Sequence, residues 1–176
     1  MKKLIYLFIL APFLAQAQET PKPTTYQEEF AGGMNYSLDQ IVKLIDVFPQ
    51  DKMTWRPGEG VRSVSETILH IAGSTYMLSS ALGTPMPEGI DPQGIEKATT
   101  DKVEILKYVN DAYAFSSDAV ASVSDEQMDE MVELPFGTFS KRALIMIIAT
   151  HSYEHKGQLI AYARVNDITP PWSGAE

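Results

Sequence analysis

Four stretches of this sequence place apolar residues three or four positions apart, and this helical period restricts the fold more than any other feature. They span residues 26–48, 63–82, 101–123 and 140–166. Pro49 closes the first, while Ser63, Asp101 and Ser140 stand where helix caps are common. The pattern predicts four amphipathic helices. Four long helices in 176 residues predict an all-α fold, a four-helix bundle.

The segments between the predicted helices differ in character. Residues 50–62 and 83–99 are long connections rich in proline and glycine, and they leave the order of the helices in the bundle open. Residues 124–139 contain Pro135-Phe136-Gly137 and are predicted to be extended or turn-like. The run ALIMIIA at 143–149 has no polar face, so we expect it to be buried on several sides.

The N-terminus has the three parts of a secretory signal. Lys2 and Lys3 precede an apolar run at 4–14, which is too short to cross a bilayer, and Ala15-Gln16-Ala17 provides a small-residue cleavage site. An uncleaved anchor or a buried first helix is the alternative interpretation. The predicted organisation is a cleaved signal peptide at 1–17, a flexible lead-in at 18–25 and a single domain at 26–176. We therefore expect an exported protein, periplasmic or extracellular.

Charge and composition exclude several classes of partner and site. The formal net charge is −9, from 14 basic and 23 acidic residues, and no basic run follows the signal. This balance argues against a nucleic-acid partner and against an anionic membrane surface, and we expect no stable membrane anchor. The chain has no cysteine, so disulfides, thiolate metal ligands and a cysteine nucleophile are all excluded.

The chain has only three histidines, and two of them, His151 and His155, lie four residues apart. On a helix they point within about 40° of each other. They continue a stripe that starts apolar and becomes polar: Leu144, Ile148, His151, His155, Gln158 and Tyr162. Such a pair by itself is a weak signal, because two partly exposed histidines would look the same. His70 lies at the edge of another core stripe, and three imidazoles with one open position are typical of a catalytic metal site.

HSYEH also matches His-x-x-Glu-His, in which two histidines bind zinc and the glutamate acts as a general base. A protease of that kind takes a further glutamate ligand from well downstream, and only Glu176 follows His155 here. We therefore disfavour the protease interpretation. Glu154 remains a weak candidate for a catalytic acid or base, with a solvated surface residue as the favoured alternative.

Two segments resemble the DinB-like superfamily, which includes YfiT-type proteins classed as metal-dependent hydrolases. Residues 54–74 contain a tryptophan-arginine-proline loop followed by a helix with one histidine. Residues 134–174 contain the ending His-x-x-x-His-[Arg/Lys]-Gly-Gln. The resemblance implies a four-helix bundle whose divalent metal, zinc or nickel, is bound by His70, His151 and His155. The sequence departs from the pattern at Glu154, where many relatives have histidine, and at Lys156, where arginine is commoner.

The resemblance implies a metal-dependent hydrolase acting on a small substrate that the sequence does not identify. A metal-dependent thiol transferase is an alternative, since some relatives use thiols, although export argues against it. A bundle that binds metal or a small ligand without catalysis is another. Members of this family often form homodimers, so the resemblance also implies a homodimer for this chain. Imidazole ligands alone would also suit copper or iron.

Other polar and aromatic residues of these segments have structural interpretations. Gln158 lies one turn beyond His155 and is either a support for that histidine or a polar core residue. We expect Trp55 and Arg56 to fasten their loop against the bundle, and Gly157 to allow close helix packing. Core positions are predicted for three tyrosines: Tyr36, Tyr76 and Tyr162.

Overall fold

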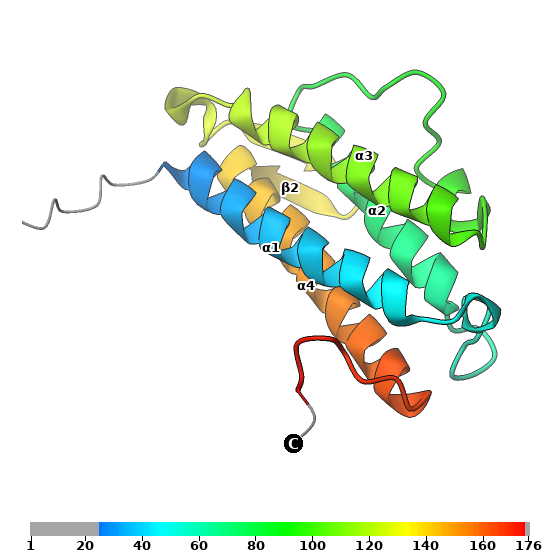
Figure 1. The fold of residues 1–176 in the computed structure, drawn as a ribbon. Helices are drawn as coiled ribbons and strands as arrows, with labels where there is room; N and C mark the ends of the chain where they lie inside the picture. The colour runs from blue at the N-terminus through cyan, green and yellow to red at the C-terminus, as the bar shows by residue number, and fades with distance from the viewer. Residues whose placement is uncertain (1–24, 175–176) are drawn as a thin grey trace, which may run out of the picture.

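The computed structural model describes residues 25–174, which form a four-helix bundle (Figure 1). The helices are α1 (Tyr26–Val47), α2 (Val64–Ser80), α3 (Lys102–Ala121) and α4 (Lys141–Val165). The predicted fold is confirmed, and each helix ends within two residues of its expected end. The predicted signal peptide and residues 18–24 of the lead-in lie outside the described residues. None of the helices in the described part is long and apolar enough to cross a membrane.

Side-chain caps fix the first turn of each helix. Thr25, the last residue of the predicted lead-in, and Ser63 each form a reciprocal capping box with the glutamate three residues later. The Asp101 side chain accepts from two amides of α3, and Ser140 accepts from the first turn of α4. These local bonds satisfy amides that the helices leave free, and they explain why the helix starts are readable from the sequence.

The connections carry the chain diagonally across the bundle. Helices α1 and α2 each pack against both α3 and α4. Hydrogen bonds join Tyr26 to Arg142 at the start of α1 and α4, and Gln40 to Lys156 further along both helices. In both helices the second partner lies further from the N-terminal end than the first. Helices α1 and α4 therefore run parallel. Helix α4 therefore has two different neighbours, α1 on one side and α2 on the other.

Helices α2 and α3 also run parallel, since Tyr76 packs against Phe115 while Thr84, just after α2, lies beside Ser122 at the end of α3. A parallel pair needs a connection that returns along the bundle, and the long segment at 81–101 serves this purpose (green in Figure 1). It contains one short 3-10 helix, η2 (Gly94–Lys97). This segment passes over α2 close to His70.

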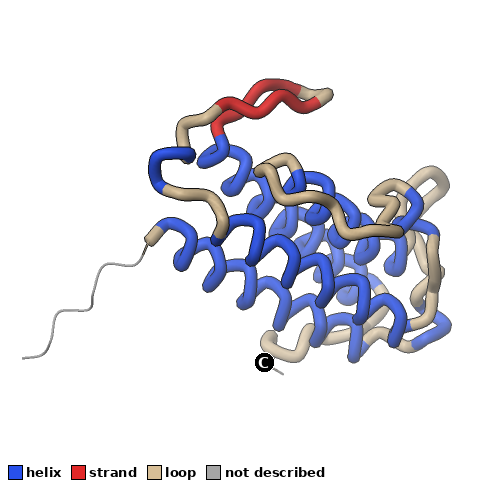
Figure 2. The backbone as a smooth tube through the Cα atoms, turned by 90° about the horizontal axis from the view of Figure 1, so that it is seen from above, coloured by secondary structure: helices blue, strands red, loops and turns tan. Residues whose placement is uncertain are grey.

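A small hairpin links α3 to α4. Strands β1 (Met131–Leu134) and β2 (Gly137–Ser140) pair antiparallel, with Met131 opposite Ser140 and Leu134 opposite Gly137. The segment predicted to be extended or turn-like therefore contains two strands. Figure 2 shows the hairpin outside the helical bundle. Since β2 ends on the cap residue of α4, the hairpin leads directly into the helix that carries two of the histidines.

Three expectations about burial are wrong. The Met146 side chain is 57% exposed, because α4 packs against α1 and α2 and leaves its outer side open. Gly157 is exposed, and a Cβ there would meet nothing within 4 Å, so it has no role in close packing. Tyr36 is 58% exposed. Tyr76 and Tyr162 are buried as predicted.

Candidate metal centre

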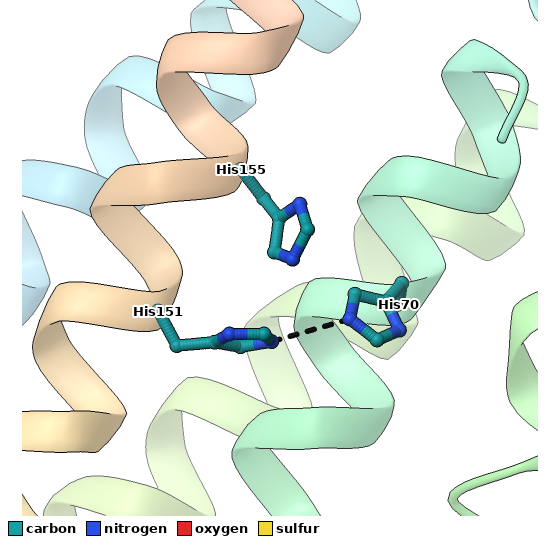
Figure 3. A group of neighbouring side chains, drawn as sticks. All are labelled: His70, His151 and His155. Carbon is teal, nitrogen blue, oxygen red and sulfur yellow. Dashed lines mark hydrogen bonds between the residues drawn. The ribbon is translucent and has the colours of Figure 1, made fainter. Parts of the chain in front are cut away.

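The three histidines come together between α2 and α4. His70 projects from α2, and His151 and His155 project from adjacent turns of α4, so that the three rings point toward one another (Figure 3). One ligand atom from each ring can be chosen so that all three lie within 4.8 Å of one another. His155 is buried, while His70 and His151 are partly exposed. The cluster is thus set into the bundle but reachable from one side.

The spacing of these ligand atoms fits a metal ion. His151 Nε2 lies 3.2 Å from His70 Nε2. Two nitrogens bound to one tetrahedral zinc, each at about 2.0–2.1 Å, stand about 3.3–3.4 Å apart. The third ring lies edge-on to both others, with its centroid 4.6 Å from that of His70 and 4.5 Å from that of His151. Three imidazoles around one point suit zinc or nickel, and the donor set alone does not choose between them.

Gln158 supports His155 from the side away from the cluster. Its Oε1 lies 2.8 Å from His155 Nδ1. Gln158 Nε2 donates to the Tyr162 hydroxyl, which donates to the carbonyl of Arg62 at 3.1 Å. Because this chain of donors assigns an acceptor role to Gln158 Oε1, the His155 Nδ1 carries the proton. His155 Nε2 is then left with its lone pair free for a metal, as in other metal-binding histidines.

Glu96 supports His70 in the same way, although the sequence analysis did not identify it. Glu96 lies in η2, and its Oε2 is 3.2 Å from His70 Nδ1. A carboxylate that accepts from Nδ1 leaves Nε2 unprotonated on the side of the cluster. Gly73 allows this approach, because a Cβ there would lie 2.3 Å from the carbonyl oxygen of Pro92. A glycine one turn after His70, facing a proline-rich connection, is the only signal that a closer inspection could have used.

Burial and neighbouring charges favour the neutral form of His70 and His151. The pKa of His70 falls to about 4, first because burial disfavours the charged ring and then because the Arg62 guanidinium lies nearby. Burial also lowers the pKa of His151, and a charge on His155 would lower it further. Neutral imidazole is the form that binds metals. At neutral pH, His70 and His151 are therefore in the form that a metal needs.

The remaining residues singled out in the sequence lie around the cluster. Glu154 is exposed on α4 and acts on His151 through its negative charge, which opposes the lowering of the pKa of that ring. Its role as an acid or base stays a prediction. Trp55 packs edge-on against Tyr162 with ring centroids 5.4 Å apart, and Arg56 pairs with Glu66 at 3.1 Å. Both contacts fasten the loop at 48–63 to the bundle.

Fold and site together define a class: a four-helix bundle with a three-histidine cluster that could bind a metal ion. Residues 35–159 match the DinB superfamily, and the chain belongs to it. The matched range covers α2 and α3 completely and includes all three histidines.

Known relatives are distant in sequence but close in fold. The YjoA protein of Bacillus subtilis (strain 168) is 24% identical over 125 residues, which are 69% of this chain and 79% of that protein. A DinB-like protein from Bacillus cereus has a TM-score of 0.70 at 18% identity, with 86% of this chain and all of that chain covered. YfiT from Bacillus subtilis, described as a probable metal-dependent hydrolase with an unusual four-helix bundle topology, has a TM-score of 0.62 at 14% identity, covering 85% and 94%.

Proposed function

We propose that His70, His151 and His155 bind a divalent metal, zinc or nickel, and that the site serves the metal-dependent hydrolysis of a small substrate. The observation that carries the proposal is the matched support of two rings, by Glu96 on His70 and by Gln158 on His155. Each support holds a proton on Nδ1 and turns Nε2 away from it. A pair of histidines that merely filled the core would need no such arrangement from two separate elements.

The ion, when bound, supplies Lewis-acid chemistry that polarises a carbonyl or activates water for hydrolysis. The residues of the chain would hold it in place: Glu96 and Gln158 fix two of the rings, and buried His155 closes the inner side. Ser74 Oγ lies 3.4 Å from His70 Nε2, so a buried hydroxyl stands beside this ligand atom. Glu154, exposed on the flank, is the weak candidate for moving a proton to or from solvent.

The first experiment is the metal content of residues 18–176, purified without a histidine tag or chelator, beside a His151→Ala, His155→Ala double variant. We expect about one equivalent in the parent protein and none in the variant, because an open catalytic site has three protein ligands and the variant keeps one. Absence of metal in the parent, even after reconstitution with zinc and with nickel, would contradict the proposal.

The second experiment separates hydrolysis from the alternatives. The metal-loaded protein, the metal-free protein and the double variant are compared on nitrophenyl esters, with and without an added low-molecular-weight thiol. Metal-dependent ester cleavage without thiol supports the hydrolase. Turnover that needs the thiol supports a transferase instead, and bound metal without turnover supports a binding protein.

Export is a separate proposal that rests on the sequence of residues 1–17. Mass spectrometry of the protein recovered from the periplasmic fraction or medium of a producing cell should give a chain that starts at Gln18. A chain that keeps Met1 and stays in the cytoplasm would contradict it.

A further inference from the structure

A small cavity opens beside the histidine cluster, between α2 and the connection at 81–101. Its volume is about 250 Å³, somewhat below the usual range for drug-sized ligands. Six of its lining residues matter for what it could bind: Arg62, His70, Ser74, Met77, Gln93 and Glu96. Because His70 belongs to both the cluster and the cavity wall, a molecule in this cavity would touch the proposed metal site.

Arg62 is the positive group of this cavity, and its side chain is 39% exposed and forms an ion pair with Glu96. Its Nε lies 3.0 Å from Glu96 Oε1, as an ion pair. The Nε atom is buried without a hydrogen-bond partner, and within residues 25–174 the Arg62 side chain donates none of the hydrogen bonds found. Buried donors without partners are rare in proteins, and a bound ligand is one way to satisfy them. The N–H groups of a guanidinium form a planar fork that matches a carboxylate.

The local charge also favours an anion, in contrast with the protein as a whole. The chain carries a net charge of −9. In the cavity, however, the charges of Glu96 and Arg62 offset each other, because the two side chains form an ion pair. A divalent ion on the histidines would leave this cavity with an excess of positive charge. An anionic ligand would therefore be attracted to this cavity and repelled by the acidic surface around it.

We propose that the substrate of this site carries a carboxylate, which Arg62 binds while the reacting group of the substrate lies at the histidines. Glu96 then has two tasks, since one oxygen holds His70 and the other holds Arg62. It fixes the carboxylate-binding group and the metal-binding ring relative to each other. The small volume and the Met77 side chain in the wall select a short, partly apolar acid. This inference rests on the proposed metal site.

The test uses the zinc-loaded protein and three hydroxamates, which bind zinc through the same group. They are acetohydroxamate, the monohydroxamate of succinic acid, and its neutral amide analogue. Affinities are measured by titration calorimetry at low and at physiological salt. In the parent protein, we expect the charged probe to bind about tenfold or more tightly than its amide, the ratio expected for one charge-assisted contact.

Substitutions of Arg62 then test whether the ratio of the two affinities, charged probe over neutral amide, depends on this residue. Arg62→Gln should bring the ratio close to one, and Arg62→Lys should keep part of it because the charge remains without the fork. Arg56→Gln is the matched control, since Arg56 pairs with Glu66 and does not line this cavity. It should leave the ratio unchanged. Acetohydroxamate binding and circular dichroism show for each variant that the metal site and the fold are kept.

The outcomes separate this inference from the proposed function. If acetohydroxamate binds but the charged and neutral probes bind the parent equally, the carboxylate proposal is wrong and the metal site stands. A ratio that survives in Arg62→Gln would also overturn it, because the charge must then be recognised elsewhere. If neither zinc nor acetohydroxamate binds, the proposed function fails, and this inference fails with it.

Discussion

Helix α4 presents two polar pairs with the same spacing to two different neighbours. His151 and His155 face α2 and meet His70; we call this interface the histidine seam. Ser152 and Lys156, each one residue later, face α1 and meet Ser37 and Gln40; we call this interface the lysine seam, and Tyr113 of α3 also contacts Ser152 there. The two pairs are neighbours in sequence, yet they lie in different environments.

In the lysine seam, the polar side chains have their partners within the protein. Lys156 donates to Gln40 Oε1 at 2.7 Å, and its ammonium lies 3.9 Å from the centre of the Tyr153 ring and 5.2 Å from that of Tyr36. Exposed Tyr36 thus helps to cover a buried cation, which explains why it is not in the core. Every polar group is matched by another group of the protein, as in a structural network.

In the histidine seam, by contrast, the polar groups are not all matched by other groups of the protein. Two rings have supports behind them, the three rings point toward one another (Figure 3), and His70 also lines a cavity. The comparison teaches that buried polar residues alone do not mark a function. A function is indicated where the supporting contacts are satisfied and the central atoms are left for something from outside. Four changes test this distinction, in order of decreasing expected effect.

His155→Ala should have the largest effect, because it removes one of three proposed ligands and the one that is most buried. We expect metal affinity to fall by more than the roughly 10–100-fold that loss of a supporting residue costs. Ser152→Ala changes α4 on its other side and should leave the affinity unchanged. Competition with a chromophoric chelator measures both. Equal losses in the two variants would mean that the effect comes from α4 folding and not from the site.

Gln158→Leu removes the support of His155, and Gln40→Leu removes the acceptor of Lys156. The first should lower metal affinity by about 10–100-fold, since His155 Nδ1 loses its fixed partner. The second should lower stability but not metal affinity. The same chelator competition, combined with urea unfolding, gives both quantities. If Gln40→Leu weakened metal binding as much as Gln158→Leu, the two seams would not be independent.

Tyr113→Phe should destabilise the metal-free protein by about 1 kcal/mol at pH 7, because the buried Tyr113 hydroxyl contacts Ser152. Burial raises the pKa of Tyr113 above its ordinary value of 10.0. The unfolded chain therefore ionises this group first as the pH rises, and the parent protein loses stability from pH 10 upward until the folded pKa is passed. The variant lacks this loss, so the difference between the two proteins should narrow above pH 10 in urea unfolding. A difference that is constant or widens would contradict the burial of this hydroxyl.

Lys156→Met should have the smallest effect, within about 1 kcal/mol of the parent at pH 7. The variant loses the bond to Gln40, but it also avoids the cost of burying an ammonium, and such exchanges are often close to neutral. Burial lowers the pKa of Lys156, in agreement with this cost. Thermal unfolding and metal content are the measurements. Loss of metal in this variant would show that the lysine seam positions the histidines.

Much of the fold was predictable because it depends on neighbours along the chain. The apolar period gave four helices, and the caps at Ser63, Asp101 and Ser140 gave three of their starts. The spacing of His151 and His155 alone placed both rings on one side of α4. These are consequences of backbone geometry within a single helix.

The features that give the site its character depend on which elements meet, and a periodic pattern does not state this. Helix α4 packs against α1 and α2 and leaves Met146 exposed on its outer side, although the segment is apolar all round. Glu96 reaches His70 only because the connection at 81–101 crosses α2 at Gly73.

The sequence by itself therefore determined the helices, their starts and the shared direction of two histidines, because hydrogen bonds and side-chain angles within a helix are local. The family resemblance implied His70 as the third ligand, but only the tertiary structure placed its ring beside the other two, set Glu96 and Gln158 against two of the rings, and put Arg62 beside them. Those contacts join segments that are far apart in the chain. Their geometry is set by how the four helices pack and by where the long connections cross them.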